Sequence, residues 1–472
     1  MALRSGASYL EALKDGREVW LGGERVNDVT AHPQLAGCAA SLAENFDLQR
    51  DPEYAGLLTS VSPRTETPIG RQWHLPRSSE DLTRGREMYE FYQRRAGGVL
   101  GRHPQHMAAV LMGVYGSRGE VATINEEWAE NIENHFDYCR ENDIALAFSA
   151  GEPHRDRKLP ASVMDYLKVV ESRPDGIIVR GGLMAATNSI YSDEFLSTCR
   201  RKDAGQDDPI YFCVPVATEG LKLVCRPSLS HAGDPGHPLA SRWDEMDVCA
   251  IFDHVFVPRN RIFLLQNDAD VSIAGPTTWA LWYVACRQVI KSEVLVGLSF
   301  GIADYMGTYD VPENRAMLAE AVSILEGLRE VVINAERQAI YSEEGLAIPN
   351  PRLVALARVI DLQTHTRLLE ITRHLCSTSL IIAPSEVEFN HPEIGPLLNH
   401  YIAGEDPRAH ERFKLSKLAW EYLGDSFAGR QLLFEEHSAG NLSRRRQQLM
   451  DNYDPNPVID LAKQLAGIDV AR

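Results

Sequence analysis

The 472-residue sequence lacks the features that mark several large classes of protein. No run of apolar residues approaches the ~18 that a membrane-spanning helix needs. The first twenty residues contain neither the apolar core nor the small-residue cleavage site of a secretory signal. The eight cysteines are scattered without any C-x-x-C pair, which disfavours a disulfide framework. We therefore expect a cytoplasmic protein with free thiols and no membrane contact.

Positive charge is also scarce. Lys and Arg number 48 against 66 Asp and Glu, for a net charge of −18, so nucleic acid is not an expected partner. The one dense basic run, Arg444–Arg446, is typical of a solvated helix face. Neither G-x-G-x-x-G nor the phosphate-loop motif G-x-x-x-x-G-K-[ST] occurs, so the usual nucleotide-binding fingerprints are missing.

What is present is ordinary globular composition, 44% hydrophobic and 24% charged, in three regions of different texture. We expect a helical domain over residues 1–142. In it, Ser79–Ala96 begins with Ser78 and Ser79 as capping candidates followed by acidic residues. A second helix is predicted over Glu126–Asn142, where apolar residues recur every three or four positions.

Residues 143–272 have the texture of a β domain. Short β-branched runs with glycine brackets follow one another without helices between them, which favours an antiparallel sandwich or barrel. Tyr211–Val216 and Leu221–Cys225 predict a hairpin joined by Ala217–Gly220, and Val248–Val257 predicts a further strand closed by Pro258. The parallel order of a Rossmann domain is absent.

Residues 273–472 are helical again, which makes the fold class α+β and mainly α. Four long segments predict a four-helix bundle: Trp279–Tyr305, Pro312–Ser342, Pro351–Ser379 and Ala409–Tyr422.

Two catalytic patterns are weak in their context. A serine-hydrolase motif, G-x-S-x-G, occurs at Gly297–Gly301, but within a predicted helix rather than at a strand-to-helix turn, so packing explains it better. His103 and His106 have proline between them and no neighbouring carboxylate or thiolate, and His365 and His374 fall on opposite helix faces. We predict no metal site.

Three polar segments remain, each marked by glycine or proline or placed where an element ends. They are Gly101–His106, Phe148–Arg157 and Ala185–Ser189. Each alone is typical of a turn. Together with Ser241–Asp247, Phe252–Pro258 and the S-F-x-G-R run at 426–430, they resemble the two-component, reduced-flavin-dependent aromatic hydroxylases of the 4-hydroxyphenylacetate 3-monooxygenase family. The likeness extends nearly end to end, from the opening Ser8–Val26 onward.

The resemblance implies the acyl-CoA dehydrogenase fold and a homotetramer formed through the C-terminal bundle. It implies an oxygenase component that receives FADH2, or FMNH2, from a separate flavin reductase. Oxygen would add to give a flavin C4a-hydroperoxide, which hydroxylates a phenolic ring. Such a site must exclude water.

The resemblance also assigns residues. Arg102 would contact substrate and flavin, holding the phenolic oxygen with its fixed charge. Thr187 and Ser189 would bond near the reactive edge of the ring, and the loop Tyr191–Asp207 would form a lid. The residues expected to line the flavin are Phe148, Ser149, Ala150, Gly151, Pro153 and Arg157. A second set is expected at the phosphate or adenosine end of the cofactor, across a subunit boundary: Phe427, Ala428, Gly429, Arg430 and Gln431.

Two positions depart from the hydroxyphenylacetate enzymes. His106 stands where they have tyrosine, and Phe148 where they have histidine, so both are expected substrate contacts with changed chemistry. His106 is either a base that activates the substrate or a supporting histidine. We expect a substrate other than 4-hydroxyphenylacetate: another phenol, a halophenol, a carrier-tethered tyrosine-like group or an amine nitrogen.

Other reactions on the same fold stay open: N-hydroxylation, oxidative dehalogenation and acyl thioester dehydrogenation. The last needs a carboxylate base facing the flavin, for which Glu435 and Glu436 are the nearest residues in sequence. A binding protein that kept the fold but lost flavin affinity is a further alternative.

Overall fold

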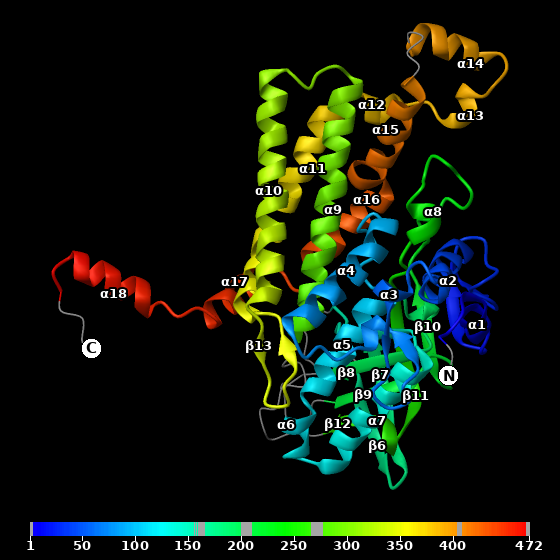
Figure 1. Cartoon of the computed structure of the whole chain (residues 1–472). Coiled ribbons are helices and arrows are strands. Elements are labelled where there is room, and N and C mark those ends of the chain that lie inside the picture. Colours follow the sequence, from blue (N-terminus) through cyan, green and yellow to red (C-terminus); the bar gives the residue numbers. More distant parts are fainter. Residues whose placement is uncertain are drawn as a thin grey trace.

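Helices, then strands, then long helices follow one another in the computed structural model (Figure 1), which describes residues 3–154, 156, 158, 166–199, 210–265, 277–403 and 408–468. This order confirms the predicted mainly helical α+β class. The domain boundaries after residues 142 and 272 stay predictions.

The two N-terminal helices predicted from capping signals form as expected. α4 (Ser79–Arg95) begins where the Ser78 hydroxyl accepts the backbone N–H of Asp81, and α7 (Glu126–Asn142) begins where Asn125 caps Glu127. The other N-terminal helices are α1 (Gly6–Ala12), α2 (Ala36–Arg50), α3 (Ala55–Leu58), α5 (Pro104–Gly116) and α6 (Arg118–Ala122).

The N-terminal region also contributes strands that the sequence analysis did not predict. β1 (Glu18–Leu21) and β2 (Glu24–Val26) form a hairpin, and β1 then pairs in parallel with a strand about 200 residues later. Val19 and Leu21 alternate with less buried residues, so only one face of this short strand is apolar. A second small hairpin joins β3 (Thr59–Val61) and β4 (Pro68–Gly70).

The central strands form two sheets. A six-stranded sheet has the order β2-β1-β10-β11-β7-β6, and a four-stranded sheet the order β12-β9-β8-β5. Phe252 of the first sheet stacks on Phe195 of the second at 5.9 Å between ring centroids, so the sheets pack as a sandwich. The bounds are β5 (Leu146–Ser149), β6 (Lys168–Arg173), β7 (Gly176–Leu183), β8 (Glu194–Cys199), β9 (Ile210–Pro215), β10 (Leu221–Cys225), β11 (Val248–Pro258) and β12 (Ile262–Leu265), with α8 (Ala240–Trp243) between β10 and β11.

The predicted hairpin over 211–225 is wrong. Both strands exist, but β9 pairs with β8 and β12, whereas β10 pairs with β1 and β11 in the other sheet. The turn at 217–220 therefore carries the chain from one sheet to the other. Two apolar strands joined by a short turn give the same local pattern whether they pair with each other or belong to different sheets. Here pairing with residues 18–21 and 194–199 places them in different sheets.

The lid predicted over residues 191–207 is also not a loop where the structure describes it. Ser189–Tyr191 forms a 3-10 turn and residues 194–199 form β8, in which Phe195 is fully buried. Residues 200–207 lie outside the described part of the chain.

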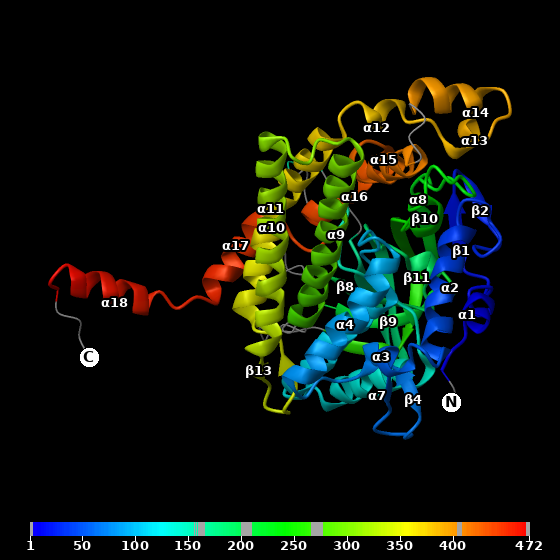
Figure 2. The same cartoon turned by 45° about the horizontal axis from the view of Figure 1, so that its top comes forward.

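The C-terminal region confirms the predicted four-helix bundle. α9 (Thr277–Tyr305), α10 (Pro312–Arg337), α11 (Pro351–Cys376) and α15 (Ala409–Leu423) pack side by side, as Figures 1 and 2 show. Ser299 of the hydrolase-like motif lies inside α9, where its hydroxyl donates to the backbone carbonyl of Leu295. A short hairpin of β13 (Ile340–Tyr341) and β14 (Ala347–Ile348) joins α10 to α11.

The remaining helices lie around the bundle. They are α12 (Ser379–Ile382), α13 (Glu386–Phe389), α14 (Ile394–Leu397), α16 (Ser426–His437), α17 (Leu442–Asp451) and α18 (Asn456–Leu465). Helices α12–α14 project from one end of the bundle over a small apolar cluster of their own, made by Ala383, Phe389, Ala403, Ala409 and Phe413. Helix α18 extends away from the body (Figure 2). None of the described helices is long and apolar enough to cross a bilayer.

Candidate active site

The turn before α5 places Arg102 against α16. Gly101 allows a close approach, because a Cβ there would lie 2.1 Å from the ring of Phe434. The Arg102 guanidinium lies 5.5 Å above that ring and donates to the backbone carbonyl of Ser438 at 2.9 Å. Its buried Nε has no hydrogen-bond partner among the described residues. Burial lowers the pKa of Arg102, and Glu245 opposes this shift.

A buried network of ion pairs joins this turn to the β region and to α16. The Arg102 backbone N–H donates to Glu245, and the Arg430 guanidinium bonds Glu245 at 2.7 Å and Asp247 at 2.6 and 2.8 Å. The Thr187 hydroxyl donates to the same Asp247 at 2.8 Å. Predicted residues from three distant segments, Arg102, Thr187 and Arg430, therefore meet around two carboxylates.

These charges are matched inside the protein. Burial alone would raise the pKa of Asp247, but hydrogen bonds and charge from Arg430 and Arg226 hold it well below its usual range. Arg226 also bonds Asp244 at 2.6 Å. Asp247 is therefore ionised at neutral pH, and the ion pairs tie Asp244–Asp247 to α16.

The segment 185–189 is shaped by a left-handed residue, Asn188, at φ 62°. Its side chain donates to the backbone carbonyl of Arg102 at 3.2 Å and accepts the Met246 N–H at 3.2 Å. Ser189 follows, fully buried, and its hydroxyl has no partner among the described residues. The turn thus closes against both Arg102 and the acidic segment.

The end of β5 and the end of β7 lie side by side near this turn. Ser149 donates from its hydroxyl to the Met184 carbonyl at 2.8 Å, and the Met184 N–H donates to the Gly151 carbonyl at 2.7 Å. A Cβ on Gly151 would lie 2.4 Å from the Met184 carbonyl oxygen, so the approach requires glycine. Phe148 is half-buried and Ala150 exposed, which leaves a partly open apolar surface over residues 148–153 and 182–185, here called the β5–β7 platform. Arg157 lies outside the described residues.

His106 lies on the first turn of α5, almost fully buried. Its Nδ1 is 3.0 Å from the Gly101 carbonyl, which links the imidazole to the turn that carries Arg102. Burial and the charges of Arg102 and Arg287 hold the pKa of His106 well below its usual 6.5. The ring is therefore neutral at physiological pH, a state that suits a positioning role.

The predicted residues of α16 face mostly inward. Phe427 and Ala428 are buried, Gly429 is exposed, and Gln431 donates to the Val99 carbonyl at 3.0 Å. Their contact with a cofactor stays a prediction, since the Arg430 guanidinium is already held by Glu245 and Asp247.

Glu435, weighed above as a base for acyl thioester chemistry, is neutralised. It accepts two hydrogen bonds of 2.6 Å from Arg287 and one of 2.8 Å from Lys291. Burial would raise its pKa, but these cations hold it well below the usual range. A carboxylate bonded to two cations is a poor proton acceptor. Glu436 is exposed.

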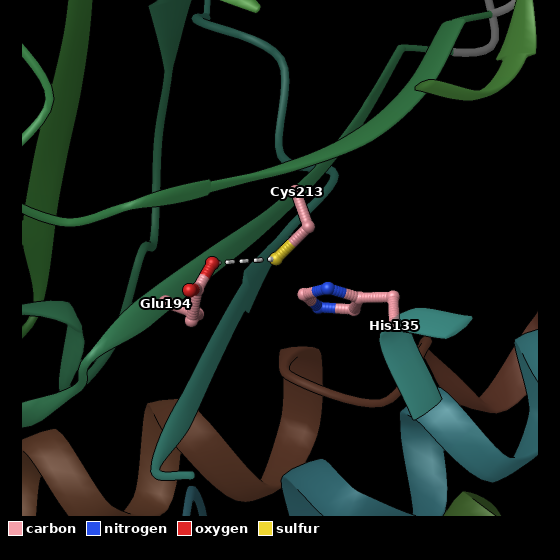
Figure 3. A group of neighbouring side chains, drawn as sticks. All are labelled: His135, Glu194 and Cys213. Atoms are coloured by element: carbon pink, nitrogen blue, oxygen red, sulfur yellow. Dashed lines mark hydrogen bonds between the residues drawn. The ribbon is translucent and has the colours of Figure 1, made fainter. Parts of the chain in front are cut away.

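A possible metal-ligand cluster lies elsewhere, between α7 and the four-stranded sheet (Figure 3). The donor atoms of His135, Glu194 and Cys213 lie within 4.8 Å of one another. However, the Arg261 guanidinium donates to Glu194 at 2.6 Å and faces the His135 Nδ1 at 3.3 Å, and the Cys139 thiol lies 3.5 Å from the other ring nitrogen. The permanent positive charge of Arg261 thus lies among the candidate ligands and opposes a metal ion there. The cluster is a structural network of hydrogen bonds and an ion pair.

Sequence reasoning missed Glu245, Asp247 and Asn188 as site residues. The two acids lie in the Ser241–Asp247 segment that carries part of the family resemblance, and Asn188 lies between two residues that were chosen. Acidic residues before an apolar strand gave no local sign that α16, about 180 residues later, would neutralise them.

The network predicts a stability effect. Glu245→Gln removes one buried charge facing Arg430 and should lower the free energy of unfolding by about 3 kcal/mol. The measurement is urea denaturation followed by fluorescence. Asp253→Asn is the control, because its ion pair with Lys222 is exposed and should leave the midpoint unchanged. Equal midpoints for Glu245→Gln and wild type would contradict the network's role.

Comparison with known proteins bears on the whole chain. Family models described as 4-hydroxyphenylacetate 3-hydroxylase N terminal and C terminal match residues 5–264 and 272–467. The chain is 33% identical over 465 residues to the 4-hydroxyphenylacetate 3-monooxygenase oxygenase component of Thermus thermophilus, covering 96% of this chain and 95% of that protein. It is 31% identical to the oxygenase component of 4-nitrophenol 4-monooxygenase/4-nitrocatechol 2-monooxygenase of Rhodococcus opacus, covering 98% and 91%.

The fold agrees with these matches. A crystal structure of the oxygenase component of 4-hydroxyphenylacetate 3-monooxygenase, complexed with FAD and 4-hydroxyphenylacetate, superposes with a TM-score of 0.90 at 31% identity, covering 98% of each chain. The chain belongs to the 4-hydroxyphenylacetate 3-hydroxylase family.

Proposed function

We propose that this chain is the oxygenase component of a two-component flavin-dependent monooxygenase that hydroxylates a phenolic substrate with O2 and with FADH2 from a separate reductase. The relatives named as oxygenase components support this reaction. The observation that carries the proposal is the convergence of Arg102, Thr187 and α16 around one buried ion network.

The residues present fit a flavin. A flat ring system needs an apolar surface with backbone groups at its edge, and the β5–β7 platform offers the half-buried Phe148, the exposed Ala150 and the backbone of Gly151. Pro153 and Ser149 complete this wall, and the buried Ser189 hydroxyl, which has no partner among the described residues, is a further donor in the following turn. When bound, reduced flavin supplies the electrons that activate oxygen. FMNH2 would fit the same platform, and Gly429 is an exposed position on α16 for the longer FAD.

Arg102 is proposed to hold the phenolic oxygen. Its guanidinium stays charged, lies over the Phe434 ring and keeps Nε without a partner among the described residues. A cation in a largely dry site stabilises the phenolate form, and a phenolate ring is a stronger nucleophile than a phenol. Arg102 thereby lowers the pKa of the bound phenol, whose proton passes to solvent, and orients the ring.

Phe148 sets the substrate class in this proposal. Phe148 brings an apolar ring where the hydroxyphenylacetate enzymes have an imidazole, which disfavours a carboxylate tail there and favours apolar phenols or halophenols. N-hydroxylation and oxidative dehalogenation use the same platform. Acyl thioester dehydrogenation is disfavoured, since Arg287 and Lys291 neutralise Glu435.

The reaction is tested with photoreduced FADH2, oxygenated buffer and a panel of phenols, with product and H2O2 measured together. Wild type should form hydroxylated product from at least one phenol. Arg102→Ala should still bind FADH2 but lose product by roughly a hundredfold, with oxygen diverted to H2O2. Unchanged product yield would remove Arg102 from the site, and failure of wild type to bind FADH2 would overturn the function.

His106 is proposed as a positioning residue for the Gly101–Arg102 turn. His106→Ala should lower kcat/KM by roughly tenfold through misplacement of Arg102, and His106→Asn should recover part of it by keeping one donor. Since burial keeps the imidazole neutral, the acidic limb of the pH profile should match wild type in both variants. A moved acidic limb would identify His106 as a base instead.

We propose a homotetramer in the cytoplasm. The cysteines at 38, 139, 213, 225, 249, 286 and 376 are free, which suits a reducing compartment. Apolar side chains are exposed on two projecting elements, with Ile381 76% exposed near α12 and Leu465 82% exposed at the end of α18, and such surfaces mark contacts between chains. Light scattering should give the mass of four chains, and deletion of residues 453–472 should lower it. An unchanged mass would exclude the tail from assembly.

We also propose that the substrate can arrive on a carrier protein. A free phenol turned over as fast as its carrier-bound form would exclude a need for the carrier. The reductase is proposed to act by releasing free FADH2 and not through a stable complex.

A further inference from the structure

The loop between β10 and α8 brings two histidines and an aspartate together far from the Arg102 site in sequence. Gly233, at φ +78°, reverses the chain. The Asp234 N–H then donates to the His231 carbonyl at 2.9 Å, and the His237 N–H donates to the Asp234 carbonyl at 3.0 Å. Two successive turns thus bring residues 231 and 237 back beside each other.

The side chains of this loop converge. The imidazole rings of His231 and His237 stack with centroids 3.8 Å apart and planes 18° apart. The Asp234 carboxylate lies 3.0 Å from the His237 Nδ1, and one donor atom of each residue falls within 4.8 Å of the others. One donor atom of each residue therefore lies close enough to the other two to bind the same ion.

Ser241, at the start of α8, holds the backbone of all three residues. Its hydroxyl lies 2.6 Å from the His237 carbonyl, 2.8 Å from that of His231 and 3.4 Å from that of Asp234. A hydroxyl has one proton to donate and so shares it among three neighbouring acceptors. The backbone of the three residues is therefore held together by a group that is not itself a ligand.

We propose that His231, Asp234 and His237 bind a divalent transition-metal ion of the Zn²⁺ class. Two imidazoles and a carboxylate are donors that Zn²⁺ takes in proteins, with water completing the tetrahedron. The Asp425 carboxylate lies near both histidines, and its buried Oδ2 has no hydrogen-bond partner among the described residues.

This cluster differs from the buried one around His135 in Figure 3. There the Arg261 guanidinium donates to Glu194 and repels a second cation. No described arginine or lysine bonds His231, Asp234 or His237, and the Asp234 side chain is 46% exposed, so an ion can reach the loop from solvent.

The position of the loop gives the ion a structural consequence. Pro235, Gly236 and Pro238 form one wall of a groove of about 370 Å³ whose other wall is α13 and α15. Asp425, beside the histidines, caps the N-terminus of α16. A bound ion would hold residues 231–237 in one conformation beside both elements, independently of the proposed flavin chemistry.

The experiment is Zn²⁺ titration calorimetry on the full, untagged chain after removal of metals with EDTA. Wild type should bind one Zn²⁺ per chain, and Co²⁺ in its place should give the visible absorbance of a tetrahedral site. His231→Ala and His237→Ala should each weaken Zn²⁺ binding by more than about a hundredfold. This exceeds the loss of affinity expected when a residue that only supports a ligand is changed. His254→Ala is the control: His254 is exposed and lies 3.2 Å from Asp253, but has no second histidine.

Ser241→Ala separates a built site from chance histidines. It removes no ligand, so it should weaken Zn²⁺ binding by roughly tenfold through the backbone it positions, while circular dichroism stays that of wild type. Wild-type Zn²⁺ affinity equal to that of the His231→Ala/His237→Ala double variant would overturn the proposal. So would equal losses from His254→Ala and His231→Ala. None of these outcomes depends on flavin binding.

Discussion

The guanidinium of Arg430 stands between the carboxylates of Glu245 and Asp247, and the arrangement of the candidate active site depends on this contact. Glu245 reaches the backbone of Arg102, and Asp247 reaches the Thr187 hydroxyl. Charges buried together are stabilising only when each is matched, so the segments keep their positions as a set.

A second buried charge group lies directly behind the first. Arg287 and Lys291 of α9 bind Glu435, one helical turn from Arg430 on α16. Helix α16 is thus held at two positions along its length. Arg430 binds carboxylates of the β region, and Glu435 binds cations of the bundle. Phe434 lies between the two groups and carries the guanidinium of Arg102 on its ring. Access to this interior by water would weaken both groups, which is consistent with chemistry that must stay dry.

Much of the helical architecture could be predicted because its signals are local. Ser78 with Asp81 and Asn125 with Glu127 set the starts of α4 and α7, and the apolar repeat sets the bundle helices. The sheet partners could not, since β1 pairs with β10 across about 200 residues and either partner suits a short apolar strand. For the site, the resemblance supplied Arg102, Thr187 and Arg430, whose contacts confirm that they lie together. Glu245 and Asp247 were not predicted as site residues because Arg430, the cation that pairs with both, lies about 180 residues later in the chain.

The small apolar cluster under α12–α14 has a consequence for how the protein opens. Phe389, Phe413 and three alanines form it apart from the main core, and so few buried side chains provide only a fraction of the free energy that holds the bundle. This cap should therefore exchange its amide protons by local opening long before global unfolding. In the cell, local unfolding would begin here, at the end of the bundle away from the strands. A protease would therefore cut the chain first in this region.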